Sequence, residues 1–574
     1  MDEQEVRSRA QLWLTDHFDE HTRNEVQRML DHDANELKES FYTDLEFGTG
    51  GLRGIMGVGT NRVNVYTIGL ASLGLAKYVR KNGNQTSPSL AIAHDSRNNS
   101  PLFARKAAEI FASQGIKVYL FSALRPTPEL SFAVRHLKCD GGVVITASHN
   151  PKEYNGYKVY WNDGAQVIPP HDKGIIEEVR QARIEDLDFN SNHELIQLID
   201  KEVDEPYLHA VMNQQLAPEV VKEQHDLKIV YTALHGTGIT LIPEVLSRMG
   251  FTQVRCVPQQ DIPDGNFPTV DSPNPEEREA LSRGLEMCRE WDADLLLGTD
   301  PDTDRVGLAV KNHKGDFVLL NGNQAGSLLV FYHLIKWHEQ GRLNGKQFIA
   351  KTIVTTELIR RISSDFGTKT YDTLTGFKYI AGLIADLEGK EEFITGGEES
   401  YGYLIGDFVR DKDAVCSAAL FCEMAAWARS KGQTLFDVLM HIYKSFGHFQ
   451  EDLVSITKKG ISGKEEIAAM MTRLRSETPR ELDGSPVILA RDYQKGEERN
   501  LVTGHVTPIE LPASNVLQFE TANGSVVTAR PSGTEPKIKF YFSVREPITE
   551  QFEYDASLEK LTGRIQRLKE VWSS

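Results

Sequence analysis

Apolar positions along this chain follow two alternating patterns. Short apolar runs that end in polar residues predict strands, and they occur within residues 89–97, 117–123, 141–151, 227–238, 293–305, 346–356 and 391–402. Between them lie stretches with helical spacing, such as LFARKAAEIFASQG at 102–115. Strands that alternate with helices predict mostly parallel sheets covered on both faces. Ligands of such sheets bind at the carboxyl ends of the strands, where the unusual polar residues of this chain occur.

The two ends of the chain follow other patterns. The first forty residues carry apolar side chains at helical spacing, from Trp13 and Phe18 to Leu30, and predict helix. Residues 47–59 contain six glycines and predict a loop. Residues 502–546 contain several short β runs separated by turn signals, and a helical tail follows at 558–572. This end is expected to form a smaller α+β domain.

A chain of 574 residues is too long for one core, because domains average ~100–200 residues. We expect a helical extension with an α/β domain, two further α/β domains and the α+β domain, around a central cleft. The expected boundaries are 1–205, 206–325, 326–455 and 456–574.

Composition narrows the function classes. The chain is 40% hydrophobic and 25% charged, with a formal net charge of −18, which argues against a general nucleic-acid or anionic-membrane binder. Its five cysteines contain no CxxC pair, so neither a disulfide scaffold nor a structural zinc site is expected. No apolar run is long enough for a membrane span, and the acidic amphipathic N-terminus is unlike a secretory signal. We expect a cytoplasmic protein.

Three aspartates, Asp300, Asp302 and Asp304, occupy alternate positions directly after the apolar LLLG. Hard carboxylate oxygens at this spacing suit Mg²⁺. A calcium EF-hand is excluded because Arg305 replaces its central glycine and Lys311 its final glutamate. The alternative is a solvated acidic turn.

Ser148 and His149 lie in TASHNP, where the chain turns after a strand. A hydroxyl presented there, near a metal, can act as a nucleophile or phosphoryl carrier. The alternative is an ordinary polar turn before proline. His149 is interpreted as a positioning residue more readily than as a base.

Two further loops carry candidate binding groups. Glu398 and Ser400 in GGEES are expected to accept hydrogen bonds from sugar hydroxyls, although the same residues suit a helix start. The segment 529–539 concentrates donors that would form a nest for a phosphate, with a plain hairpin loop as the alternative. Its candidate residues are Arg530, Ser532, Gly533, Thr534 and Lys537.

Basic residues are expected in the same strand-end loops, where they would give a phosphorylated substrate local positive potential. They are Arg53, Arg97, Lys158, Arg305, Lys378, Arg410 and Lys412. Neither a GxxxxGK[ST] nor a GxGxxG motif follows a strand, so a nucleotide-dependent kinase or a dinucleotide enzyme is not indicated.

Four motifs, TASHNP, GTDPDTDR, GGEES and RPSGTEPK, occur in the order that is typical of one family. The chain resembles the α-D-phosphohexomutases, the phosphoglucomutase and phosphomannomutase superfamily. Stretches such as LHGTG and PDGNFPTVDSPNPEE are most similar to the branch of bacterial phosphoglucomutases, phosphopentomutase and glucose-1,6-bisphosphate synthase.

The resemblance implies four domains around a cleft, each supplying one loop. It implies that Ser148 is phosphorylated and, with the three aspartates, binds Mg²⁺. It implies that the other named loops bind the sugar hydroxyls and the non-reacting phosphate, with Arg305, Lys378 and Lys537 also on the substrate. The implied catalytic residues are Ser148, His149, Lys158, Arg53 and Lys412.

The implied activity is reversible interconversion of glucose 1-phosphate and glucose 6-phosphate through glucose 1,6-bisphosphate, by a monomer or homodimer. Phosphopentomutase, phosphomannomutase and hexose-bisphosphate synthase activities stay open. Gly402 departs from members with histidine there, which favours glucose or pentose phosphates over mannose phosphates.

Overall fold

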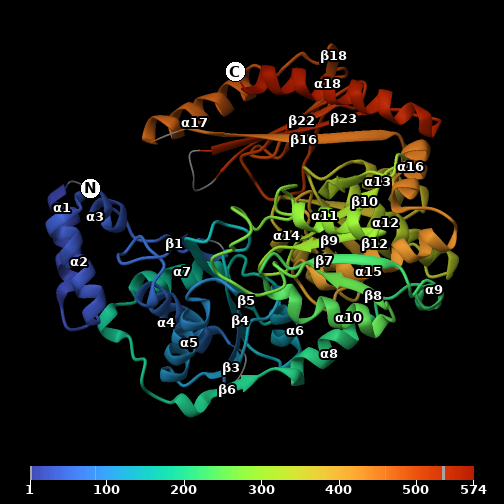
Figure 1. Cartoon of the computed structure of the whole chain (residues 1–574). Coiled ribbons are helices and arrows are strands. Elements are labelled where there is room, and N and C mark those ends of the chain that lie inside the picture. Colours follow the sequence, from blue (N-terminus) through green and yellow to red (C-terminus); the bar gives the residue numbers. More distant parts are fainter. Residues whose placement is uncertain (1–2, 49, 84–85, 459, 533–536, 574) are drawn as a thin grey trace.

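The computed structural model describes residues 3–48, 50–83, 86–458, 460–532 and 537–573, of which 460–462 and 573 are described by their backbone alone. Four sheets follow one another along the chain (Figure 1). The first, with its helices, fills the lower left of the view, the second and third lie together on the right, and the fourth lies along the top.

The first sheet has the order β1-β5-β4-β2-β3-β6. Its strands are β1 (Gly51–Ile55), β2 (Ser89–His94), β3 (Lys117–Phe121), β4 (Gly141–Ile145), β5 (Tyr154–Trp161) and β6 (Ile196–Ile199). Leu90 and Ile92 of β2 pack in the cluster formed with α4 (Val65–Asn82) and α5 (Ser100–Ser113), while Ala91 packs in the cluster of α6 (Thr127–His136). Because alternate side chains face opposite sides of a strand, helices cover both faces.

The second sheet, β11-β10-β9-β7-β8, and the third, β13-β12-β14-β15, mix parallel and antiparallel pairs. Their strands are β7 (Lys228–Thr232), β8 (Gln253–Cys256), β9 (Leu295–Thr299), β10 (Val306–Lys311), β11 (Phe317–Leu320), β12 (Gln347–Thr352), β13 (Lys369–Thr373), β14 (Glu392–Gly397) and β15 (Tyr403–Ile405).

One apolar cluster joins these two sheets, and helix α15 (Ala414–Ser430), which is buried along nearly its whole length, belongs to it. A helix that is apolar on every side is buried among its neighbours, so α15 packs between the two units and holds them together. The other helices around these two sheets are α8 (Lys201–Met212), α9 (Pro218–Glu223), α10 (Ile242–Met249), α11 (Ser282–Trp291), α12 (Gly322–Glu339), α13 (Leu358–Asp365), α14 (Phe377–Leu387) and α16 (Leu435–Phe446). Helix α7 (His171–Gln181) instead packs against α4 in the core of the first sheet.

The fourth sheet is antiparallel, with β16-β23-β22-β21-β18-β19-β20 as its main path, and α17 (Gly460–Ser476) and α18 (Tyr554–Ser573) contribute to its separate core. Its strands are β16 (His448–Thr457), β17 (Glu481–Leu482), β18 (Ser485–Asp492), β19 (Glu497–Asn500), β20 (Val506–Pro508), β21 (Leu517–Thr521), β22 (Val526–Pro531) and β23 (Lys537–Glu546). The predicted α+β unit is confirmed. It adjoins the third sheet through β16, which directly follows α16.

The amino-terminal segment is helical as predicted but consists of separate helices, α1 (Glu3–Gln11), α2 (Glu20–His32) and α3 (Ala34–Phe41). Asp19 and Asp33 interrupt it because their carboxylates accept the backbone N–H groups of Thr22 and Glu36, as N-caps do.

The glycine-rich segment is more than the predicted loop, since β1 within it pairs with β5 at the sheet edge. The seven predicted strands are present. No helix in the described ranges is long and apolar enough to cross a lipid bilayer.

Candidate active site

Three of the predicted motifs meet at the strand ends of the first three sheets. Ser148 follows β4, the aspartate loop joins β9 to β10, and Glu398 follows β14. A cavity of about 280 Å³ brings several predicted residues together. Its lining includes Arg53, Ser148, Lys158, Asp304, Arg305 and Lys412.

Ser148 is held in a conformation that aims its hydroxyl at the aspartate loop. Its φ of 52° lies in the left-handed region, which is uncommon for serine and costly unless the surroundings impose it. The backbone N–H donates to Thr146 Oγ1 at 2.8 Å, and the carbonyl accepts from the buried Arg97 at 2.6 Å. The hydroxyl then donates to Asp300 Oδ2 at 2.7 Å.

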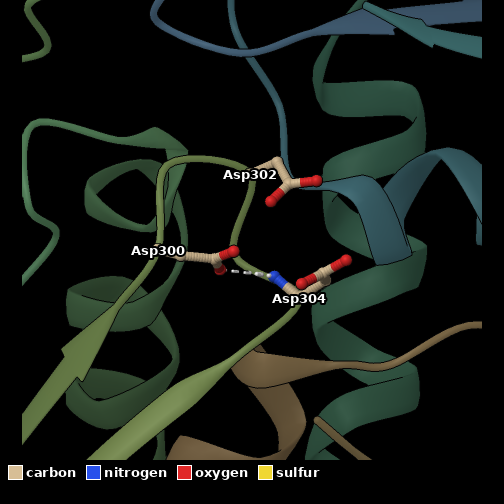
Figure 2. A group of neighbouring side chains, drawn as sticks. All are labelled: Asp300, Asp302 and Asp304. Carbon is tan, nitrogen blue, oxygen red and sulfur yellow. Dashed lines mark hydrogen bonds between the residues drawn. The ribbon is translucent and has the colours of Figure 1, made fainter. Parts of the chain in front are cut away.

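Figure 2 shows the three aspartates on one tight loop. One carboxylate oxygen from each lies within 4.8 Å of the others, and all three residues are buried. Asp300 Oδ1 accepts the backbone N–H groups of Asp304 and Arg305 at 3.1 and 3.0 Å. Burial, and then repulsion from Asp302 and Asp304, raises the pKa of Asp300 well above its usual value.

This donor set fits a hard divalent cation. Asp302 Oδ1 and Asp304 Oδ1 are buried and have no hydrogen-bond partner within the described ranges. Buried carboxylate oxygens without partners are costly, and a cation that bound all three groups would remove both that cost and the repulsion. The predicted ligand residues are therefore together, with the Ser148 hydroxyl beside them.

Two lysines border the triad. Lys158 Nζ contacts Asp302 Oδ2 at 2.7 Å and Asp304 Oδ2 at 3.1 Å, and Lys412 Nζ lies 3.1 Å from both Asp304 Oδ2 and Asp411 Oδ1. Burial opposes their charge, but the neighbouring carboxylates outweigh it and raise the pKa of each lysine. Both are therefore ammonium groups that line the cavity and donate hydrogen bonds to the neighbouring carboxylates.

The surroundings of His149 disfavour a protonated imidazole at neutral pH. Its Nδ1 lies 3.1 Å from Ser148 Oγ. Burial, followed by the positive charges of Arg305 and Arg53, lowers the pKa of His149 to about 3. The ring is thus neutral at pH 7, which agrees with a positioning residue.

Two more of the predicted basic residues, Arg53 and Arg305, line the same cavity. Arg53 is in β1 and Lys158 in β5, rather than in strand-end loops: β5 pairs antiparallel with β4, and β1 pairs antiparallel with β5. Arg53 donates to Asn150 Oδ1 at 3.1 Å, and Arg305 pairs with Glu276 at 2.6 Å.

The GGEES segment forms the turn between β14 and β15, so the alternative of a helix start is wrong. The nearly buried Glu398 accepts the Gly376 N–H at 2.9 Å, which ties the turn to the start of α14. Ser400 is partly exposed in the same turn. Lys378 lies in the first turn of α14 rather than in a loop, and burial lowers its pKa.

The predicted phosphate-binding segment lies where β22 and β23 pair. Arg530 belongs to β22 and lies opposite Lys539 of β23, so it is part of a strand rather than a loop. The Ser532 N–H donates to the Lys537 carbonyl at 2.7 Å, while Gly533 and Thr534 lie outside the described residues.

Glu399, which follows Glu398 in the turn, acts electrostatically on this strand pair. Burial, then Lys537 and Arg530, lowers the pKa of Lys539, and Glu399 acts in the opposite direction. Arg530 lies 3.5 Å from the hydroxyl of Tyr541, whose pKa is raised by burial and then by Glu399.

Sequence reasoning missed several residues of the site. Thr127, from α6, donates to Asp302 Oδ2 at 2.9 Å, and nothing local in the sequence indicated this contact. Lys539 could have been found, because it follows Lys537 by two positions and therefore shares its strand face. Arg97 was noted only as a basic residue, but it holds the Ser148 backbone.

Comparisons with known proteins agree with this geometry. Three family descriptions match in order: phosphoglucomutase/phosphomannomutase alpha/beta/alpha domain I at residues 44–185, domain II at 205–315 and domain III at 321–446. The phosphoglucomutase of Staphylococcus epidermidis (strain ATCC 12228) is 41% identical over 517 residues, which cover 89% of this chain and 92% of that protein. That of Staphylococcus aureus (strain USA300) is 39% identical with the same coverage.

Solved structures show the same fold at low identity. A phosphoglucomutase/phosphomannomutase family protein of Burkholderia thailandensis matches with a TM-score of 0.67 at 18% identity, covering 92% of this chain and 97% of that one. The open form of the Paramecium phosphoprotein parafusin, a phosphoglucomutase, matches with a TM-score of 0.67 at 16% identity, covering 92% and 95%.

Proposed function

This chain belongs to the phosphoglucomutase/phosphomannomutase family, and we propose from that premise that it interconverts glucose 1-phosphate and glucose 6-phosphate with Ser148 as the phosphoryl carrier. The observation that carries the proposal is the 2.7 Å contact between the Ser148 hydroxyl and Asp300, inside a cavity that Lys158 and Lys412 also line. A hydroxyl between a triad suited to a cation and two ammonium groups suits reversible phosphoryl transfer.

Asp300, Asp302 and Asp304, with an oxygen of phosphorylated Ser148, would hold Mg²⁺. When bound, the ion would neutralise charge on the transferring phosphoryl group. The chain's own contribution is electrostatic and geometric. Lys158 and Lys412 donate hydrogen bonds to the equatorial phosphoryl oxygens, and Arg97 and Thr146 hold the Ser148 backbone in place.

In the forward step, the free C6 hydroxyl of glucose 1-phosphate attacks the phosphorus of phospho-Ser148. A bond from phosphorus to the sugar oxygen forms as the bond to Ser148 Oγ breaks, and the hydroxyl proton passes, in net terms, to Ser148 Oγ. The product is glucose 1,6-bisphosphate. The sugar then turns over, and Ser148 Oγ attacks the phosphorus of the C1 phosphate. The bond from phosphorus to the C1 oxygen breaks, the serine proton passes, in net terms, to that oxygen, and glucose 6-phosphate leaves with phospho-Ser148 restored.

Both orientations need one site for the phosphate that does not react. We assign it to Arg530, Ser532, Gly533, Thr534 and Lys537, since guanidinium, hydroxyl and backbone donors on one segment suit phosphate. Glu398 and Ser400 are assigned to the sugar hydroxyls, and Arg305 and Lys378 to the surrounding positive potential.

Location and assembly belong to the same proposal. The five cysteines are free, and four of them are buried, which suits the reducing cytoplasm. We propose a cytoplasmic monomer or homodimer.

The experiment is a panel of glucose 1-, mannose 1-, ribose 1- and glucosamine 1-phosphates, assayed with Mg²⁺ and glucose 1,6-bisphosphate. Each substrate is assayed for the isomer of the same sugar with the phosphate at its primary hydroxyl, and glucose 1-phosphate should react fastest. A faster pentose or mannose reaction would overturn the glucose assignment, and net accumulation of bisphosphate from a phosphoryl donor would instead indicate a synthase.

A further inference from the structure

A second and larger cavity, of about 960 Å³, lies between the third and fourth sheets. One wall comes from α13 and the residues after β12, and the other from β18, β21, β22 and β23. Phe449 of β16, the strand that follows α16 into the fourth sheet, also lines it. The two cavities share no lining residue, although Tyr541 at this one contacts Arg530.

Most charges in this cavity are paired. Arg360 contacts Glu357 at 3.0 Å and Asp372 at 2.5 Å, within one wall. In the other wall, Arg491 contacts Glu498 at 2.5 Å and Glu520 at 3.0 Å. These carboxylates are therefore already engaged.

Arg361 of α13 and Arg545 of β23 differ from the other arginines of the cavity. Within the described part of the chain, neither side chain makes a hydrogen bond or an ion pair. Their guanidinium carbons lie 5.7 and 5.8 Å from the centroid of the same buried ring, Phe449. The exposed Asp365 also lines the cavity and pairs with neither.

The two guanidinium groups are close enough to affect one another. Burial, and then the positive charge of Arg361, lowers the pKa of Arg545, and Glu520 opposes this. Arg361 is exposed and Arg545 is half-buried, so water screens part of their mutual repulsion, but no carboxylate in the described ranges pairs with either guanidinium. An anion between them would relieve the repulsion, and the planar guanidinium fork matches phosphate oxygens in pairs.

We propose that this cavity is a second anion site, which takes a small phosphate-bearing polyanion between Arg361 and Arg545. The bound anion would bridge the third and fourth sheets, because Arg361 is in α13, which packs on β13 of the third sheet, and Arg545 is in β23 of the fourth. The fourth sheet also carries Arg530, so an anion that fixes its position would be coupled to substrate binding. Such coupling is reciprocal.

The test is isothermal titration with pyrophosphate in Mg²⁺-free buffer, on the full chain carrying Arg530→Gln so that the proposed substrate-phosphate site is weakened. We expect saturable binding of one equivalent that is at least tenfold weaker after Arg361→Gln plus Arg545→Gln. Arg361→Lys plus Arg545→Lys should retain part of the affinity. Arg499→Gln is the matched control, because Arg499 is an exposed arginine of the fourth sheet outside the cavity.

Absence of saturable binding in the Arg530→Gln protein would overturn the proposal, as would binding that the paired glutamine substitutions leave unchanged. An equal loss with Arg499→Gln would also overturn it, because binding would then follow net charge. None of these outcomes touches the proposed mutase function, which is read from product formation by the wild-type enzyme.

Discussion

The side chain of Lys412 occupies the space that a Cβ atom on Gly402 would need, so a substitution at Gly402 tests the role of Lys412. A Cβ atom at residue 402 would lie 2.0 Å from Lys412 Cδ and 2.8 Å from its Cγ. Atoms cannot approach so closely, so Gly402→Ala must displace the lysine side chain. In its present position, the Lys412 ammonium lies 3.1 Å from both Asp304 Oδ2 and Asp411 Oδ1 and above the ring of Phe377.

The expected loss of kcat/KM can be worked out from these contacts. A hydrogen bond to a charged group contributes about 1.5–3 kcal/mol, and each ~1.4 kcal/mol lost from the transition state slows a reaction tenfold. If the displaced ammonium no longer reaches the phosphoryl oxygens, kcat/KM should fall by roughly 10–100-fold. The fold should survive, because the far part of a lysine side chain can move.

The assay is glucose 6-phosphate formation by four proteins: wild type, Gly402→Ala, Lys412→Ala and the double variant. If Gly402→Ala acts through Lys412, the double variant should be no slower than Lys412→Ala alone. Gly382→Ala in α14 is the control, since its Cβ would make an ordinary 3.6 Å contact with Ile168. Activity of Gly402→Ala within twofold of wild type, or effects that multiply in the double variant, would refute the reasoning.

Three more predictions follow from named contacts. Ser148→Ala should abolish turnover and also remove about 80 Da, one phosphoryl group, from the intact mass; substantial remaining turnover would exclude the carrier role. Asp302→Asn should weaken activity and Mg²⁺ binding together, read by titrating the metal, and an unchanged metal dependence would contradict the triad. Burial raises the pKa of Glu451 to about 7 against opposing hydrogen bonds from Thr356 and Ser543. The folded state therefore favours the protonated carboxyl of Glu451. Its contribution to the free energy of unfolding is fully present below the unfolded pKa, near 4.5, and is lost as pH rises through 7. Glu451→Gln should exceed wild type in stability by about 1–3 kcal/mol at pH 8 and match it near pH 4.5 in denaturant titrations, whereas an equal difference at both pH values would contradict the assignment.

The sequence alone determined the parts of this protein that depend on short-range patterns. Apolar runs of strand length predicted the strands, since a strand buried on both faces needs an unbroken apolar run. Asp300, Asp302 and Asp304 could be assigned to one cation because a single turn holds them. Their placement after a strand was also predictable, because parallel strands carry ligands at their carboxyl ends.

Tertiary structure decided how these parts meet. Ser148 and Asp300 are 152 positions apart, and only the packing of the first sheet against the second brings their oxygens to 2.7 Å. The same packing places Thr127 on Asp302 and makes His149 neutral by burying it beside Arg305 and Arg53. The close approach of Gly402 to Lys412 and the two unpaired arginines beside Phe449 likewise had no local signal. Periodicity reports which face of an element is buried, whereas burial against a particular partner depends on contacts that no single segment encodes.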